Sequence, residues 1–228
     1  MRLKIISLYC ALLFLSGCAT TELSLTKDAQ REIKSADSTL MVPQNNLLVR
    51  VNPVQLHGFG IIGAVVGAAI DSSRTAEAEK TAQPITEKLK DYNFRQILLT
   101  ELDENFRRVI AFKITKTQVS EVNSESFRRI KYDKSVESAV LFINCDYSLG
   151  EGGLSVVALA ELFPKTEGLK KFRKQPDDTN PLATGNAIYR KTFRVARQGV
   201  SELNIKTYLS ESAASIAKQL ADDLDHGL

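Results

Sequence analysis

The chain of 228 residues carries 30 Lys or Arg and 27 Asp or Glu, which gives a formal net charge of +3. This near balance argues against nucleic acid as a partner, because proteins that bind it carry a strong positive excess. With three cysteines and two histidines, the sequence predicts neither a disulfide framework nor a metal site, and it suggests no cofactor.

The first residues, MRLKIISLYCALLFLSGC, follow the pattern of a secretory signal. Arg2 and Lys4 form a basic start, residues 5–15 are mostly apolar, and small residues precede Cys18. The apolar run reaches about half of the roughly 20 residues that a helix needs to cross a bilayer. We therefore predict a signal peptide over residues 1–17 and no membrane span there.

Leu15-Ser16-Gly17-Cys18 resembles the lipobox of bacterial lipoproteins. The resemblance implies that the signal is cut before Cys18 and that acyl chains on this residue anchor the protein in a membrane, which two or more chains do stably. Ala19 in place of Asp implies, by the enterobacterial sorting pattern, an outer-membrane protein that faces the periplasm. The alternative is an ordinary secreted protein with a cysteine at this position.

Residues 18–45 are polar and mixed in charge, which predicts a lipidated tether between the membrane and the domain. A flexible chain of this length spans about 30 Å on average. A short helix over residues 27–36 is the alternative, and it would shorten that reach. The folded periplasmic domain is then predicted over residues 46–228.

Hydrophobic spacing and turn residues predict the elements of that domain. Asn93 and Gln96 form a capping box at a helix start, and the glycines around residues 150–153 predict a hairpin. The predicted strands cover residues 46–54, 111–119, 139–149, 154–163 and 186–196, and the predicted helices cover 93–109, 124–135 and 210–224. This order predicts an α+β fold with a mixed, largely antiparallel sheet of about four to five strands packed by two or more helices.

The same order of elements resembles the domain of periplasmic assembly lipoproteins such as the penicillin-binding-protein activator and the curli secretion lipoprotein. It runs strand, helix, strand, a strand pair near Asp146-Tyr147, and a final helix, over about residues 46–226. The resemblance implies a role in binding or assembly in the cell envelope.

The stretch HGFGIIGAVVGAAID, residues 57–71, places Gly58, Gly60 and Gly63 at the G-x-G-x-x-G spacing of dinucleotide folds. No second strand follows over residues 72–92, so we predict no nucleotide. Gly63 and Gly67 also form G-x-x-x-G, which lets helices approach closely. The stretch is similar to glycine-rich segments of uncharacterised envelope lipoproteins.

Two interpretations of the uncharged part of this stretch, residues 59–70, stay open. It is either a small-residue helix packed on its own domain or an exposed surface that meets a second copy, a partner or the membrane. The second interpretation makes Gly60, Gly63 and Gly67 candidate interaction residues.

A second candidate surface is the polar segment 164–186, where four basic residues surround Phe172: Lys170, Lys171, Arg173 and Lys174. It is either a mobile, solvated loop or a contact for an anionic partner, which Arg190 and Arg194 on one face of the next strand would extend.

No catalytic motif accompanies these features, and we predict that Cys145 is a buried, unreactive thiol. The leading hypothesis is a non-catalytic, outer-membrane-anchored lipoprotein that binds or assembles with another envelope component, either a protein partner or a second copy. The alternatives are a periplasmic enzyme that acts on cell-wall material and an oligomeric, pore-like assembly through the glycine-rich segment.

Overall fold

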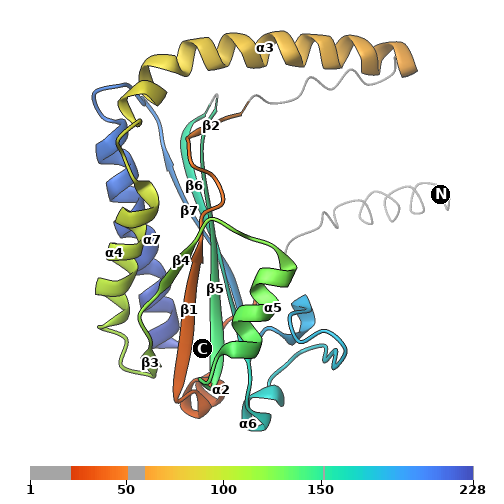
Figure 1. Cartoon of the computed structure of the whole chain (residues 1–228), viewed down its shortest axis with the longest axis vertical. Helices are drawn as coiled ribbons and strands as arrows, with labels where there is room; N and C mark the ends of the chain where they lie inside the picture. Colours follow the sequence, from red (N-terminus) through yellow and green to blue (C-terminus); the bar gives the residue numbers. More distant parts are fainter. Residues whose placement is uncertain (1–21, 51–59, 151, 228) are drawn as a thin grey trace, which may run out of the picture.

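The computed structural model describes residues 22–50, 60–150 and 152–227, and for residues 60–72 it describes the backbone only. Within these residues, seven strands form one mixed sheet whose main path runs β3-β1-β5-β6-β7. Helices cover both faces of this sheet (Figure 1). The α+β class predicted from the sequence is confirmed.

The longest part of the sheet is the antiparallel hairpin of β5 (Ala139–Gly150) and β6 (Gly153–Pro164). Gly153 has a φ of 99°, and a Cβ added there would lie 2.1 Å from the Arg197 carbonyl oxygen, so a side chain does not fit at this turn. β7 (Tyr189–Arg197) continues the sheet antiparallel to β6. The predicted hairpin and the strand after it are confirmed.

One inner strand of the sheet is a segment that the sequence did not predict as a strand. β1 (Ser35–Met41) pairs in parallel with β5 on one side, and with β3 (Lys113–Ile114) and β4 (Gln118–Ser120) on the other. Before it, α2 (Lys27–Glu32) is capped by the Thr26 side chain.

The predicted tether over residues 18–45 is therefore wrong from Leu23 onward, where the chain already pairs with Arg190 of β7. Its polar composition was misleading because Ser38 and Thr39 are buried in the sheet, where Ser38 accepts a hydrogen bond from the Thr117 hydroxyl. The domain thus includes residues 23–45. Residues 1–21, with the predicted signal peptide and Cys18, lie outside the described part.

Two predicted strands are shorter or divided in the structure. The strand predicted over 46–54 contains β2 (Leu48–Val49), which pairs in parallel with the end of β5, and residues 51–59 are not described. The strand predicted over 111–119 is divided into β3 and β4, because the Asp103 carboxylate accepts the Thr117 amide between them and takes it out of the ladder.

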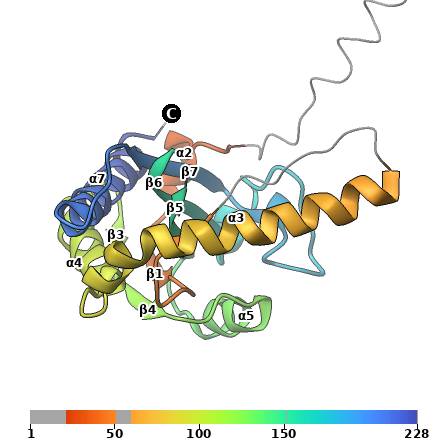
Figure 2. The same cartoon turned by 90° about the horizontal axis from the view of Figure 1, so that it is seen from above.

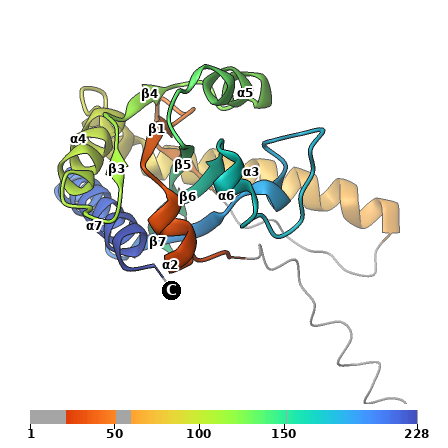
Figure 3. The same ribbon diagram turned by 90° about the horizontal axis from the view of Figure 1, so that it is seen from below.

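Two helices cover one face of the sheet and enclose the main core. α4 (Phe94–Phe106) begins at Asn93, whose side chain accepts the Gln96 amide as the capping box predicted. α7 (Ile205–His226) starts five residues before its predicted beginning and packs beside α4 (Figures 1 and 3). The buried residues of α4 recur at helical spacing: Phe94, Leu98, Leu102 and Phe106.

The other face is only partly covered. α5 (Glu125–Lys134), α6 (Glu167–Lys170) and the segment up to the short helix η2 (Thr184–Asn186) lie on this side, as Figure 1 shows. Beneath them a second apolar cluster contains Met41, Tyr132, Val140, Phe142, Phe163 and Ala187.

A long helix, α3 (Gly60–Lys88), crosses one end of the sheet, and its beginning projects beyond the strands (Figure 2). Ala82 is buried, and Ile85 packs against the main core, so the second half of the helix is fixed to the domain. None of the described helices combines the length and the apolar character needed to cross a membrane.

Candidate functional site

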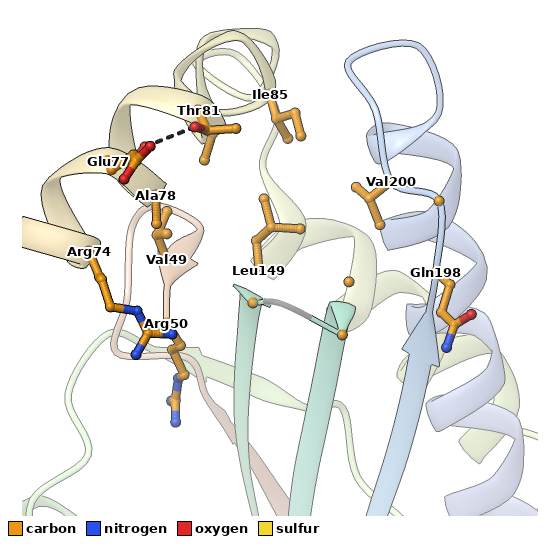
Figure 4. Close-up of a pocket in the computed structure, with 15 residues that line it drawn as sticks. Val49, Arg50, Arg74, Glu77, Ala78, Thr81, Ile85, Leu149, Gln198 and Val200 are labelled. Carbon is orange, nitrogen blue, oxygen red and sulfur yellow. Dashed lines mark hydrogen bonds between the residues drawn. The ribbon is translucent and has the colours of Figure 1, made fainter. Parts of the chain in front are cut away.

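A cleft of about 830 Å³ opens between α3 and the end of the sheet. One wall is α3 from Arg74 to Ile85, and the floor is the tip of the β5–β6 hairpin. β2 and the turn at 198–200, which follows β7, close the two sides (Figure 4). The volume lies in the range of sites that hold small molecules or side chains of a partner.

Apolar side chains line the floor and part of the walls of this cleft. Leu149, Ile85 and Val200 come from three different elements, and Figure 4 shows them facing the same space. Gly150 and Gly153 present bare backbone at the tip of the hairpin. An occupant can therefore approach the main chain closely, as glycine permits.

The charged residues of the cleft lie toward one side (Figure 4). Arg50 and Arg74 are together on that side in Figure 4, beside Glu77, whose carbonyl oxygen accepts a hydrogen bond from the Thr81 hydroxyl. The Arg50 amide donates to the Leu149 carbonyl oxygen at 2.8 Å, which fixes the end of β2 against the hairpin. The cleft thus combines an apolar floor with a charged margin.

The sequence did not predict this cleft, because residues 72–92 read only as a polar, helical stretch. The small residues Ala78 and Ala82 among them, and the glycines at 150–153, were the available signal of a close approach.

The candidate residues Gly60, Gly63 and Gly67 lie in the first half of α3. The surroundings of residues 60–72 are outside what the structure describes. Both interpretations of this stretch, packing on its own domain and exposure to a partner, therefore stay predictions.

The candidate basic residues of the 164–186 segment mostly have acidic partners. Lys170 pairs with Glu167, Lys171 with Glu32, and Arg173 with Asp178, whereas Lys174 is exposed. These pairs offset much of the positive charge that the sequence pattern suggested. The anionic contact stays a prediction, with less free charge to support it.

Many residues of the same segment are exposed, as in a solvated loop, but a buried side chain holds part of it through hydrogen bonds. Asn186 is 1% exposed; its side chain accepts the Asp177 amide and donates to the carbonyl oxygens of Asp177 and Asn180. The Asp177 carboxylate in turn accepts from the amide and hydroxyl of Thr179 and from the Asn180 amide, which lowers its pKa. The buried Asn186 side chain therefore holds residues 177–180 in place by hydrogen bonds.

Arg190 and Arg194 lie on one face of β7 as predicted, but they have different roles. Arg190 pairs at 3.4 Å with Glu161, which also accepts a hydrogen bond from Arg128 at 2.8 Å. Arg128 lies 4.8 Å from the centre of the Phe142 ring. Glu161, which the sequence analysis missed, is a buried carboxylate held by two cations, whereas Arg194 is exposed.

Cys145 is buried, as predicted, with none of its surface exposed. Burial raises the pKa of its thiol far above the ordinary value, which keeps the sulfur protonated and unreactive. Within residues 22–50, 60–150 and 152–227, no three His, Cys, Asp or Glu side chains gather as a metal site would require.

Comparison with known proteins gives little beyond this geometry. No protein-family model and no curated protein matches the chain. Among solved structures, the chain is similar to protein XCC0632 from Xanthomonas campestris, described by the family model DUF330. The identity is 10%, the match covers 82% of each chain, and the TM-score is 0.33, so this likeness carries no argument.

Proposed function

We propose that this chain is a lipoprotein of the outer membrane, anchored by acyl chains on Cys18, whose periplasmic domain binds another envelope protein without catalysing a reaction. The lipobox Leu15–Cys18 supports the anchor. The observation that carries the binding role is the cleft beneath α3, with its apolar floor of Leu149, Ile85 and Val200.

The shape of this cleft favours a protein segment as its occupant. The space is open to solvent along α3, and it exposes both apolar side chains and the backbone of Gly150 and Gly153. A peptide can fill such a site with side chains while its main chain lies along the hairpin tip. The charged margin of Arg50 and Glu77 would then select the polar residues that flank the apolar ones.

We propose a non-catalytic role because two buried ionisable groups are not placed to reach a substrate. The buried carboxylate of Glu161 is neutralised by Arg128 and Arg190, and the Cys145 thiol is enclosed. Groups fixed in this way stabilise a fold and have no free path to a substrate.

The anchor is tested by the mass and the location of the native protein. Mass spectrometry should find acyl chains on Cys18 as the first residue, and Cys18→Ser should move the protein out of the membrane fraction. An unmodified mature chain, or an unchanged fractionation of the variant, would refute the anchor.

The binding role is tested by crosslinking in intact cells with a photoreactive amino acid at Thr81, an exposed residue of the cleft. The matched control is the same amino acid at Ile110, which is 88% exposed and lies outside the cleft. We expect one defined protein to be captured from position 81 only, and its purified form should bind the wild-type domain but not Leu149→Glu. Equal capture at both positions, or adducts with copies of this chain alone, would contradict a distinct partner in the cleft.

A further inference from the structure

We propose that the folded domain lies directly against the membrane that holds its anchor, with the free edge of β7 facing the lipid headgroups. This inference rests on the proposed acylation of Cys18. It assigns a lipid surface to the free edge of β7, whose last residues lie next to the turn that closes one side of the cleft.

The chain between the proposed anchor and the folded domain is short. Leu23 is held by two hydrogen bonds to Arg190, of 2.7 and 2.8 Å, and Leu25 is buried. Only residues 19–22 therefore separate Cys18 from the folded domain. A fully extended chain advances at most about 3.6 Å per residue, so the Cα atoms of Cys18 and Leu23 are at most about 18 Å apart.

This short connection leaves the domain beside β7. Leu23 pairs with β7 on the side away from β6, and the Glu22 carboxylate accepts the Thr192 amide there at 3.4 Å. α2 and the C-terminal end of α7 lie on the same side, whereas β4 and α5 lie at the opposite edge (Figures 2 and 3). The anchor thus draws the β7 edge toward the membrane.

The free edge of β7 carries backbone groups that no strand pairs with. Because Arg190 directs its amide and carbonyl to Leu23, the alternate residues Arg194 and Ala196 direct theirs to the same side. In the described chain these two residues have no strand beyond them and are exposed, so their amides are available as hydrogen-bond donors. Lipid phosphates are suitable acceptors for such donors.

The charges beside the edge also favour an anionic surface. Arg194 is exposed and forms no ion pair in the described residues, so its guanidinium is available. The acidic residues nearest on α7 are neutralised, since Asp223 pairs with Lys191 and Asp222 with Lys218. Anionic headgroups attract a basic group only over a short distance. The short connection of residues 19–22 would keep Arg194 within that distance.

The orientation has a consequence for the proposed partner. A domain held this close presents its cleft within a few nanometres of the bilayer, so the partner is expected to be at that membrane as well. The opposite edge at β4 lies four strand spacings away from β7, or about 19 Å.

The test measures how close each edge comes to lipid headgroups. The acylated protein is reconstituted in vesicles of phosphatidylethanolamine and phosphatidylglycerol that carry a headgroup quencher. A fluorophore is attached at Ala196→Cys, on the β7 edge, or at Val122→Cys, which is 51% exposed beyond β4. The native Cys145 is fully buried and stays unlabelled. We expect several-fold stronger quenching at position 196 than at position 122.

A second pair of variants separates the tether from the charge. Inserting 20 Gly/Ser residues between Ala19 and Thr20 should reduce the difference between the two labels, because the domain can then leave the surface. Arg194→Glu should weaken quenching at position 196 on anionic vesicles, whereas Arg107→Glu, an exposed residue just after α4, should not.

The outcomes distinguish the two proposals. Protein that fails to float with the vesicles overturns both the anchor and the orientation. Protein that floats but shows equal quenching at both labels overturns the orientation alone. Burial of the 196 label by self-association of the Cys18→Ser chain without lipid also overturns it, because a second copy would then cover the edge.

Discussion

The substitution Leu40→Ala tests whether β1 is a central strand of the sheet. Leu40 is fully buried and lies opposite Ile143 in the parallel pairing with β5. If the segment were a solvated tether, removing most of this side chain would change nothing in the folded domain.

Leu40→Ala should lower the free energy of unfolding, because the neighbours of Leu40 cannot move in to fill the cavity that the substitution leaves. Leu→Ala substitutions in cores cost 2–5 kcal/mol, because transfer energy is lost and a cavity remains. β1 has strands on both sides and α4 with α7 above the face that Leu40 occupies, so little relaxation is possible. We expect the free energy of unfolding to fall by about 3 kcal/mol, or about two orders of magnitude in the folding equilibrium.

The assay is urea denaturation of the non-acylated Cys18→Ser chain, followed by circular dichroism. The control is Leu48→Ala in β2, where the side chain is 40% exposed and the expected loss is below about 1 kcal/mol. The two variants differ in burial and share the same chemical change. A loss below about 1 kcal/mol at Leu40, equal to that at Leu48, would refute the placement of β1 in the core.

Three further predictions concern the side chains of Asn186, Asp177 and Cys145. Asn186→Ala removes four hydrogen bonds from a buried site, so we expect about 2 kcal/mol less stability and faster proteolytic cleavage of the segment 175–186, measured against wild type under limited protease. Hydrogen bonds from Thr179 and Asn180 lower the pKa of the Asp177 carboxyl below its ordinary value of 3.8. The ionised carboxylate therefore orders the segment at any pH above 3.8, and this contribution is lost as the pH falls through the lowered pKa. NMR titration should show that inflection below 3.8, with faster amide exchange at Thr179 and Asn180 on its acid side; an inflection above 3.8 would contradict the hydrogen-bond geometry. Cys145 should be inert to thiol reagents in the native protein at pH 8 and react at once in denaturant, and rapid native labelling would show that the strand is open.

The candidate site could be predicted from the sequence only in part. The pattern of lysines and arginines at 170–174 was visible, but Glu32, which pairs with Lys171, is far away in the sequence and belongs to a helix that was not placed in the domain. The cleft was not predictable, because its walls come from four separate parts of the chain. Local pattern reports which residues are charged, and only the fold decides which charges meet.

The sequence by itself determined the elements whose signal is local. The β5–β6 hairpin follows from two apolar runs around glycines, and α4 and α7 follow from apolar residues at helical spacing after a capping residue or before Gly227. The backbone hydrogen bonds of these elements form within one helix or between strands that are neighbours in the chain, so the local sequence pattern is enough to predict them.

Only the tertiary structure decided the place of β1. SADSTLM has polar residues at positions that become buried, and its partners in β3, β4 and β5 lie 78 to 103 residues later in the chain. Parallel pairing between such distant segments leaves no local signature, since each strand is stable only when the others are in place. The pairing of Leu23 with Arg190, which joins equally distant segments, leaves few residues between the fold and Cys18, so in the proposed lipoprotein the fold would also limit the distance between domain and membrane.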